Sequence, residues 1–136
     1  MTKNIDLNKY KEFVEGVTSQ ASNNLSTFVE SLENIESKGI NAPLLLTSAI
    51  GMCGESGEFS EIIKKLSFHG KELTPEIHLH LQKELGDVIW YWTNACRALN
   101  VDPNKVIADN VTKLEARYPG GTFDAWYSDN RKHGDI

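Results

Sequence analysis

The sequence has few cysteines and no long hydrophobic run, and these absences exclude several classes of protein. Its 136 residues include two cysteines, Cys53 and Cys96, which have neither zinc-motif spacing nor the pattern of a disulfide framework. No apolar stretch approaches the roughly 18 residues of a membrane-spanning helix, and the N-terminus contains no apolar signal segment. We therefore expect a cytoplasmic protein with reduced thiols.

Basic residues are also in short supply. The 14 lysines and arginines are outnumbered by 19 acidic residues, which gives a net charge of −5. Such a chain has no basic field to hold nucleic acid or an anionic membrane, so we expect neither as a partner. Its length fits one domain with its own core.

Apolar residues recur at helical spacing along most of the chain, which predicts an all-α fold. The expected helices span residues 7–19, 26–37, 43–67, 75–99 and 103–117. Pro43, Pro75 and Pro103 each stand in a first turn, where the missing N–H costs nothing. These elements predict a four- to five-helix bundle. The expected core of helix 43–67 is Leu45, Leu46, Ala49, Ile50, Phe59, Ile62, Ile63 and Leu66. The next two helices are expected to add Ile77, Leu81, Leu85, Val88, Trp92, Ala95 and Leu99, and then Val106, Ile107, Val111 and Leu114.

Two acidic pairs lie within the central helices. Glu55 and Glu58 are three residues apart, as are Glu84 and Asp87, and this spacing puts both members of a pair on one helix face. If the two faces meet, four carboxylates converge, and their mutual repulsion calls for a bound cation. Oxygen ligands select hard cations such as Mg²⁺ or Mn²⁺. The alternative is a set of solvated acids on amphipathic helices.

Glycines cluster around these acids, at positions 51, 54, 57 and 86. A glycine within a helix costs about 1 kcal/mol relative to alanine, so several together suggest that a neighbouring helix or a ligand approaches the backbone closely.

Two further rows flank the acidic pairs. Tyr91 continues the face of Glu84 and Asp87. On helix 103–117, Asn110, Lys113 and Arg117 step by three and four. This row is either a solvated helix face or, beside a metal site, a set of donors for phosphate oxygens.

The histidines show no ligand spacing with the acids. His78 and His80 are two residues apart and cannot both face one site on a helix, so we expect solvated or rim positions. The absence of Glu-x-x-His argues against a di-iron bundle.

Three segments in order, GESGEFSEIIKK, KELGDVIWYW and NVTKLEARYP, resemble the MazG-like nucleoside triphosphate pyrophosphohydrolases of the all-α NTP pyrophosphatase superfamily. The resemblance covers about residues 43–119. It implies a single MazG-like domain over residues 1–136, with a core at 43–119, N-terminal helices at 7–38 and a C-terminal tail at 120–136. The insert 22–39 and the tail are less typical of the family.

The resemblance also implies roles for particular residues. Glu55, Glu58, Glu84 and Asp87 match the Mg²⁺ ligands, with Mn²⁺ expected to substitute, and Glu61 matches a third acid of the first motif. The substrate-binding positions are matched by Tyr91, Asn110, Lys113 and Arg117. Family members are homodimers or homotetramers.

The reaction expected from the resemblance converts a (d)NTP into a (d)NMP and pyrophosphate, and a purine such as dGTP is favoured. Glu55 is the first candidate for the catalytic proton acceptor and Glu58 the second. Two alternatives stay open: a non-enzymatic helical interaction protein, and a hydrolase of an alarmone or of damaged nucleotides.

Overall fold

A computed structural model describes residues 6–131, and these residues form seven helices and no strand. The predicted all-α fold is confirmed. The helices fall into two compact units, one up to Pro43 and one from Leu44 onward. Residues 1–5 and 132–136, the ends of the predicted single domain, lie outside the described part of the chain. The single-domain organisation stays a prediction.

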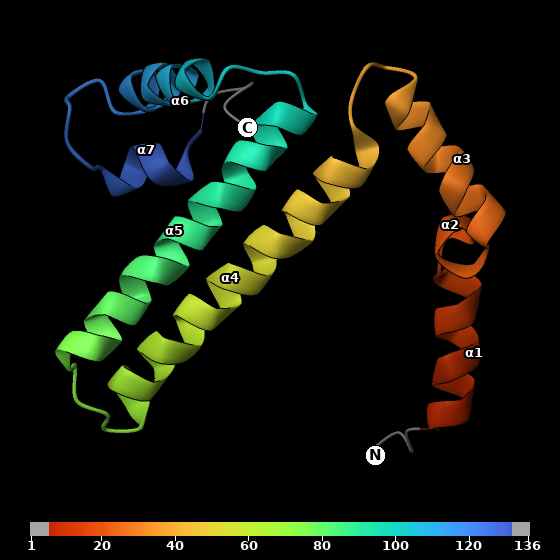
Figure 1. Cartoon of the computed structure of the whole chain (residues 1–136), viewed down its shortest axis with the longest axis horizontal. Helices are drawn as coiled ribbons and strands as arrows, with labels where there is room; N and C mark the ends of the chain where they lie inside the picture. The colour runs from red at the N-terminus through yellow and green to blue at the C-terminus, as the bar shows by residue number, and fades with distance from the viewer. Residues whose placement is uncertain (1–5, 132–136) are drawn as a thin grey trace. The chain divides into compact units, whose positions relative to one another are not determined.

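The first unit holds three helices: α1 (Leu7–Val17), α2 (Gln20–Asn23) and α3 (Leu25–Glu36) (Figure 1). The helix expected over residues 7–19 ends earlier, at Val17, and the short α2 follows it. Ser19 and Asn24 explain the breaks, because each caps the next helix. The Ser19 hydroxyl accepts from the N–H of Ser22 at 3.3 Å, and Asn24 Oδ1 accepts from the N–H of Thr27 at 3.1 Å. Such side-chain bonds offer the backbone an alternative to continued helix.

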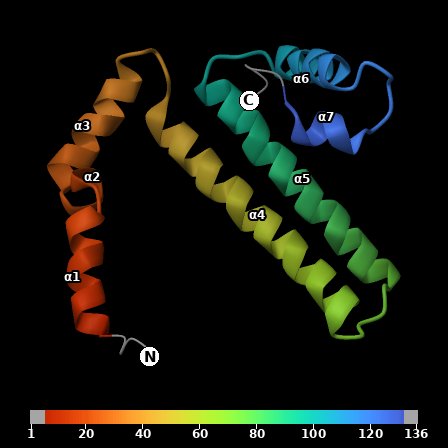
Figure 2. The ribbon, with the colours of Figure 1, turned by 180° about the vertical axis from the view of Figure 1, so that it is seen from behind.

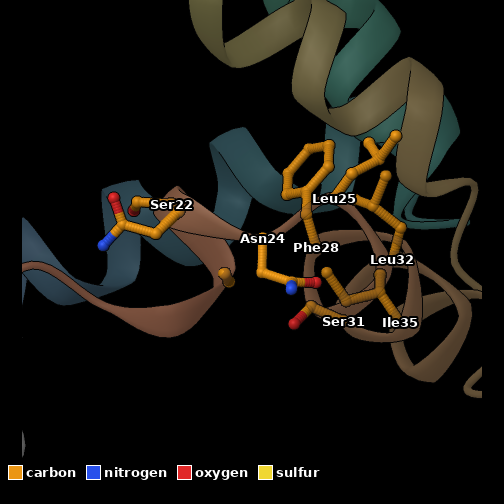
Figure 3. A pocket seen from close by; sticks show the side chains of 9 residues that line it. Ser22, Asn24, Leu25, Phe28, Ser31, Leu32 and Ile35 are labelled. Atoms are coloured by element: carbon orange, nitrogen blue, oxygen red, sulfur yellow. The ribbon is translucent and has the colours of Figure 1, made fainter.

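The apolar stripe of α3 lines an open hollow. Leu25, Phe28, Leu32 and Ile35 stand along it, with Ser22, Asn24 and Ser31 as polar neighbours (Figure 3). No residue of α1, α2 or α3 is buried. The local order of these helices therefore comes from their caps and side-chain hydrogen bonds more than from a buried core.

The second unit is built on a hairpin of two long helices, α4 (Ala42–Phe68) and α5 (Pro75–Ala98), which lie side by side in both views (Figures 1 and 2). The predicted ranges were 43–67 and 75–99. The start of α5 agrees with the prediction, and each of the other three ends differs from it by one residue. The Thr74 hydroxyl caps α5 by accepting from the N–H of Ile77 at 3.3 Å, and Pro75 occupies the first turn.

Helix α5 ends in a left-handed residue, a position that glycine usually occupies. Here the residue is Asn100, with φ of +55°. The N–H of Val101 bonds to the carbonyl of Cys96 at 3.0 Å, and the N–H of Asn100 bonds to that of Arg97 at 3.2 Å. This is the Schellman arrangement, and asparagine tolerates the left-handed conformation that it needs.

Helix α6 (Pro103–Arg117) has the predicted bounds, and a short helix that was not predicted, α7 (Ala125–Asp129), lies in the tail. Both begin at an aspartate cap. Asp102 Oδ1 accepts from the N–H of Asn104 at 2.9 Å, and Asp124 Oδ1 accepts from the N–H of Trp126 at 2.8 Å. The capping rule that located α6 would also have located α7.

The predicted core is only partly buried in the chain by itself. The apolar side chains buried among the described residues are Ala42, Cys96 and Ala98. Part of the expected core is exposed, Ile50 by 65% and Leu85 by 52%, together with Leu46, Ala49, Ile63, Leu99, Ile107, Val111 and Leu114. The rest is half-buried: Leu45, Phe59, Ile62, Leu66, Ile77, Leu81, Val88, Trp92, Ala95 and Val106. A helical hairpin is a single layer, and burying a helix stripe takes a second layer against it. None of the helices within residues 6–131 is long and apolar enough to cross a membrane.

Candidate metal centre

Three carboxylates meet between α4 and α5. Oxygens of Glu55, Glu58 and Glu84 all lie within 4.8 Å of one another. Glu55 and Glu58 share one face of α4 because they are three residues apart. The hairpin brings α5 back along α4, so that Glu84 stands opposite this face. We call these three side chains the carboxylate trio.

Glu84 is the buried member of the trio. Glu84 is 5% exposed, whereas Glu55 is half-buried and Glu58 is exposed. The Glu84 oxygen Oε2 is fully buried and accepts no hydrogen bond from any described residue. Leaving such an acceptor unpaired costs about 1–3 kcal/mol, and more when it is charged. A divalent cation satisfies both this oxygen and the charge of the trio, so the residues present fit Mg²⁺ or Mn²⁺.

Asp87 lies outside the trio but acts on it. It is exposed, and no oxygen of it joins the group within 4.8 Å. The pKa of Glu55 is raised above its ordinary value, first by partial removal from water and then by the negative charges of Glu58, Asp87 and Glu84. The charges of Glu58, Glu84 and Asp87 therefore all act on Glu55, but Asp87 does so from outside the close contact of the trio.

Glu61, the third acid of the first motif, faces two lysines. It forms an ion pair with Lys64, and Lys65 Nζ lies 3.4 Å from Glu61 Oε1. The hydrogen bond from Lys64 is the main cause that lowers the pKa of Glu61. Glu61 is thus held in ordinary i,i+3 and i,i+4 pairing and does not join the trio.

One of the clustered glycines allows a close approach between the helices. A β-carbon on Gly51 would collide with the ring of Tyr91, which is half-buried and packs edge-on against Trp90 at a centroid distance of 4.8 Å. At Gly54, Gly57 and Gly86, nothing in the described chain lies within 4 Å of an added β-carbon. Gly54 and Gly57 instead line an open hollow that also contains Glu58.

The row on α6 is not part of the trio. Asn110 is exposed, while Lys113 and Arg117 are half-buried. The role of these three residues, and that of Tyr91, stays a prediction.

One neighbour of the trio escaped the interpretation of the sequence. His80, which was expected at a solvated or rim position, is indeed exposed, but its Nε2 lies 2.7 Å from Glu84 Oε1. The spacing of four between His80 and Glu84 was the signal that could have revealed this contact.

Comparison with known proteins agrees with this arrangement. The family model described as MazG nucleotide pyrophosphohydrolase domain matches residues 45–122, a stretch that contains the whole trio. The Gene 37 protein of Mycobacterium phage L5 is 36% identical over 84 residues, which cover 60% of this chain and 72% of that protein. No solved structure matches the chain significantly. More than half of the chain is covered by the family model, and the chain belongs to the MazG nucleotide pyrophosphohydrolase family.

Proposed function

We propose that this chain is a Mg²⁺-dependent nucleoside triphosphate diphosphatase, which cleaves the α–β bond of a (d)NTP to give a (d)NMP and pyrophosphate. One observation carries the proposal. In a chain of the MazG family, the buried Glu84 presents an unpaired oxygen beside Glu55 and Glu58. A polyphosphate bound by metal ions is the substrate that such a centre suits, and dGTP is the first candidate.

In this proposal, Glu55, Glu58 and Glu84 hold the metal and Asp87 is the fourth ligand. Mg²⁺, for which Mn²⁺ substitutes, supplies neutralisation of phosphate charge and a lowered pKa for a bound water. The resemblance makes Glu55 the first candidate for the proton acceptor. Glu58 is the second candidate for this role.

The substrate contacts rest on the resemblance and on side-chain chemistry. Tyr91 lies about two turns beyond Glu84 on α5 and is proposed to contact the sugar or a phosphate. On α6, Lys113, Asn110 and Arg117 offer two cations and an amide to phosphate oxygens. Fixed donors at the leaving pyrophosphate stabilise charge where it develops during the reaction.

We also propose that the cytoplasmic, active form is a homodimer or homotetramer. Support comes from large apolar side chains that one chain leaves exposed on its long helices, such as Ile50 at 65%, Ile89 at 58% and Trp90 at 58%. Exposed apolar patches of this kind mark surfaces that bind another chain. Light scattering on the purified protein tests the proposal, and a strictly monomeric, active protein would contradict it.

A substrate panel tests the activity. Common and modified NTPs and dNTPs are incubated with Mg²⁺, and the products are separated into monophosphate, diphosphate, pyrophosphate and orthophosphate. We expect monophosphate and pyrophosphate from at least one dNTP. Release of orthophosphate would contradict α–β cleavage. Turnover of ppGpp or of damaged nucleotides alone would show that the substrate is not a common (d)NTP.

Two variants connect this activity to the carboxylates. Glu55→Gln and Asp87→Asn keep the side-chain shape but remove a charge from the metal ligands, so we expect turnover to be abolished while circular dichroism stays unchanged. Glu61→Gln is the matched control and is expected to retain activity, because Glu61 pairs with Lys64 and Lys65. Full Mg²⁺-dependent activity in Glu55→Gln and Asp87→Asn would contradict the proposed mechanism, in which these carboxylates hold the metal.

A further inference from the structure

His80 and Glu84 form a contact at the edge of the carboxylate trio. They stand one turn apart on α5, with His80 Nε2 at 2.7 Å from Glu84 Oε1. The His80 side chain is 56% exposed, whereas that of Glu84 is 6% exposed. The pair therefore joins a solvent-facing ring to the buried acid of the trio.

The chemistry of the pair fixes the direction of its hydrogen bond. An ionised carboxylate can only accept, so Nε2 of His80 carries the hydrogen and donates it to Oε1. This holds for the neutral ring with its proton on Nε2 and for the charged ring alike. One oxygen of Glu84 is thus engaged, and the other, Oε2, stays buried and unpaired beside Glu55 and Glu58.

We propose that His80 is a positioning residue of the metal centre. By holding Oε1, it keeps Glu84 in the orientation that presents Oε2 as a ligand oxygen. His80 also lines the same open hollow as Gly54, Gly57 and Glu58, one member of the trio. The proposal rests on the proposed function, because it requires the trio to bind a metal.

A simpler role for the contact is the support of helix α5. An i,i+4 pair on a helix surface contributes only about 0.3–0.5 kcal/mol to stability, and loss of a hydrogen bond to a buried acceptor costs about 1–3 kcal/mol. Hydrogen-bond partners of ligating side chains behave differently, since their loss lowers metal affinity about 10- to 100-fold. Metal affinity, measured without any substrate, therefore separates the two roles.

The experiment compares three variants of the full chain. His80→Phe keeps a ring but loses the donor, and His80→Gln replaces the imidazole by an amide donor of similar reach. His78→Phe makes the same change at another exposed position on α5. Mn²⁺ binding is followed by calorimetry and by the electron paramagnetic resonance signal of free Mn²⁺ at pH 7.5, and helicity is checked by circular dichroism.

We expect His80→Phe to bind Mn²⁺ at least about 10-fold more weakly than the parent, and both His80→Gln and His78→Phe to stay within about threefold of it. Unchanged affinity in His80→Phe would overturn the proposal. Equal weakening in His80→Phe and His80→Gln would also overturn it, because the donor would then be irrelevant. If the parent chain binds no Mn²⁺, the proposed function itself fails, which is a distinct result.

Discussion

The ring of Tyr91 on α5 occupies the space in which a β-carbon on Gly51 of α4 would stand. This contact sets how closely the two long helices approach one turn away from the carboxylate trio. It also ties a residue proposed to touch the substrate to the packing of the hairpin.

Gly51→Ala tests that contact. The added methyl group forces the Tyr91 ring to move, and overpacking of this kind costs about 1–3 kcal/mol. We expect a lower free energy of unfolding in urea and weaker nucleotide binding. Gly54→Ala is the matched control on the same helix, because nothing described lies within 4 Å of its new methyl group. The control should gain up to about 1 kcal/mol from helix propensity, and equal stability of the two variants would refute the steric role of Gly51.

Divalent metal should stabilise the protein. An ion that binds only the folded chain adds about 2.7 kcal/mol at a concentration 100 times its Kd. We expect Mg²⁺ and Mn²⁺ to raise the melting temperature and EDTA to reverse the rise, as measured by differential scanning fluorimetry. If the acids are only the charged face of an interaction protein, the melting temperature will not respond.

Glu84→Gln should separate the effect of the buried charge on stability from its role in metal binding. The amide oxygen can still accept from His80, while the charge beside Glu55 and Glu58 disappears. Without metal, we expect the variant to be at least as stable as the parent, because a buried unpaired charge is expensive. With Mn²⁺, the rise in melting temperature should be lost. A variant that is still stabilised by Mn²⁺ as strongly as the parent would exclude Glu84 as a ligand.

The raised pKa of Glu55 predicts a pH dependence for the metal-free protein. Its ordinary value is 4.5, and the folded chain holds the proton more tightly than the unfolded chain does. Stability from this group is therefore complete below the ordinary pKa and is lost as pH rises through the raised one. In EDTA, Glu55→Gln should melt at a higher temperature than the parent at pH 8, and the difference should vanish near pH 4. A difference independent of pH would show that the charge of Glu55 is not its cause.

Glu61→Gln should behave differently from the changes within the trio. The pKa of Glu61 is lowered by Lys64 and Lys65, so its contribution to stability is present at neutral pH and disappears on acidification. Exposed pairs contribute at most about 1 kcal/mol, and we expect a loss no larger than this at pH 7. Mn²⁺ affinity, measured by calorimetry, should not change. A tenfold weaker affinity would instead place Glu61 among the ligands.

The sequence by itself determined the local structure of this protein. Prolines in first turns and aspartate or threonine caps located the starts of α5 and α6, and the i,i+3 spacing of Glu55 and Glu58 put them on one face. These are short-range effects, which depend on residues within one or two turns. The break at Ser19 and the helix α7 obey the same capping rules, so both were accessible from the sequence.

Only the tertiary structure decided which of these faces meet. Spacing alone does not place Glu84 against α4, does not leave Asp87 at the edge of the trio, and does not seat Tyr91 on Gly51. These outcomes depend on the rotation and register of one helix against another, which side-chain packing over the whole hairpin determines. The same reason explains the exposed stripe of Leu85 and Ile50, since periodicity identifies an apolar face but not the surface that covers it.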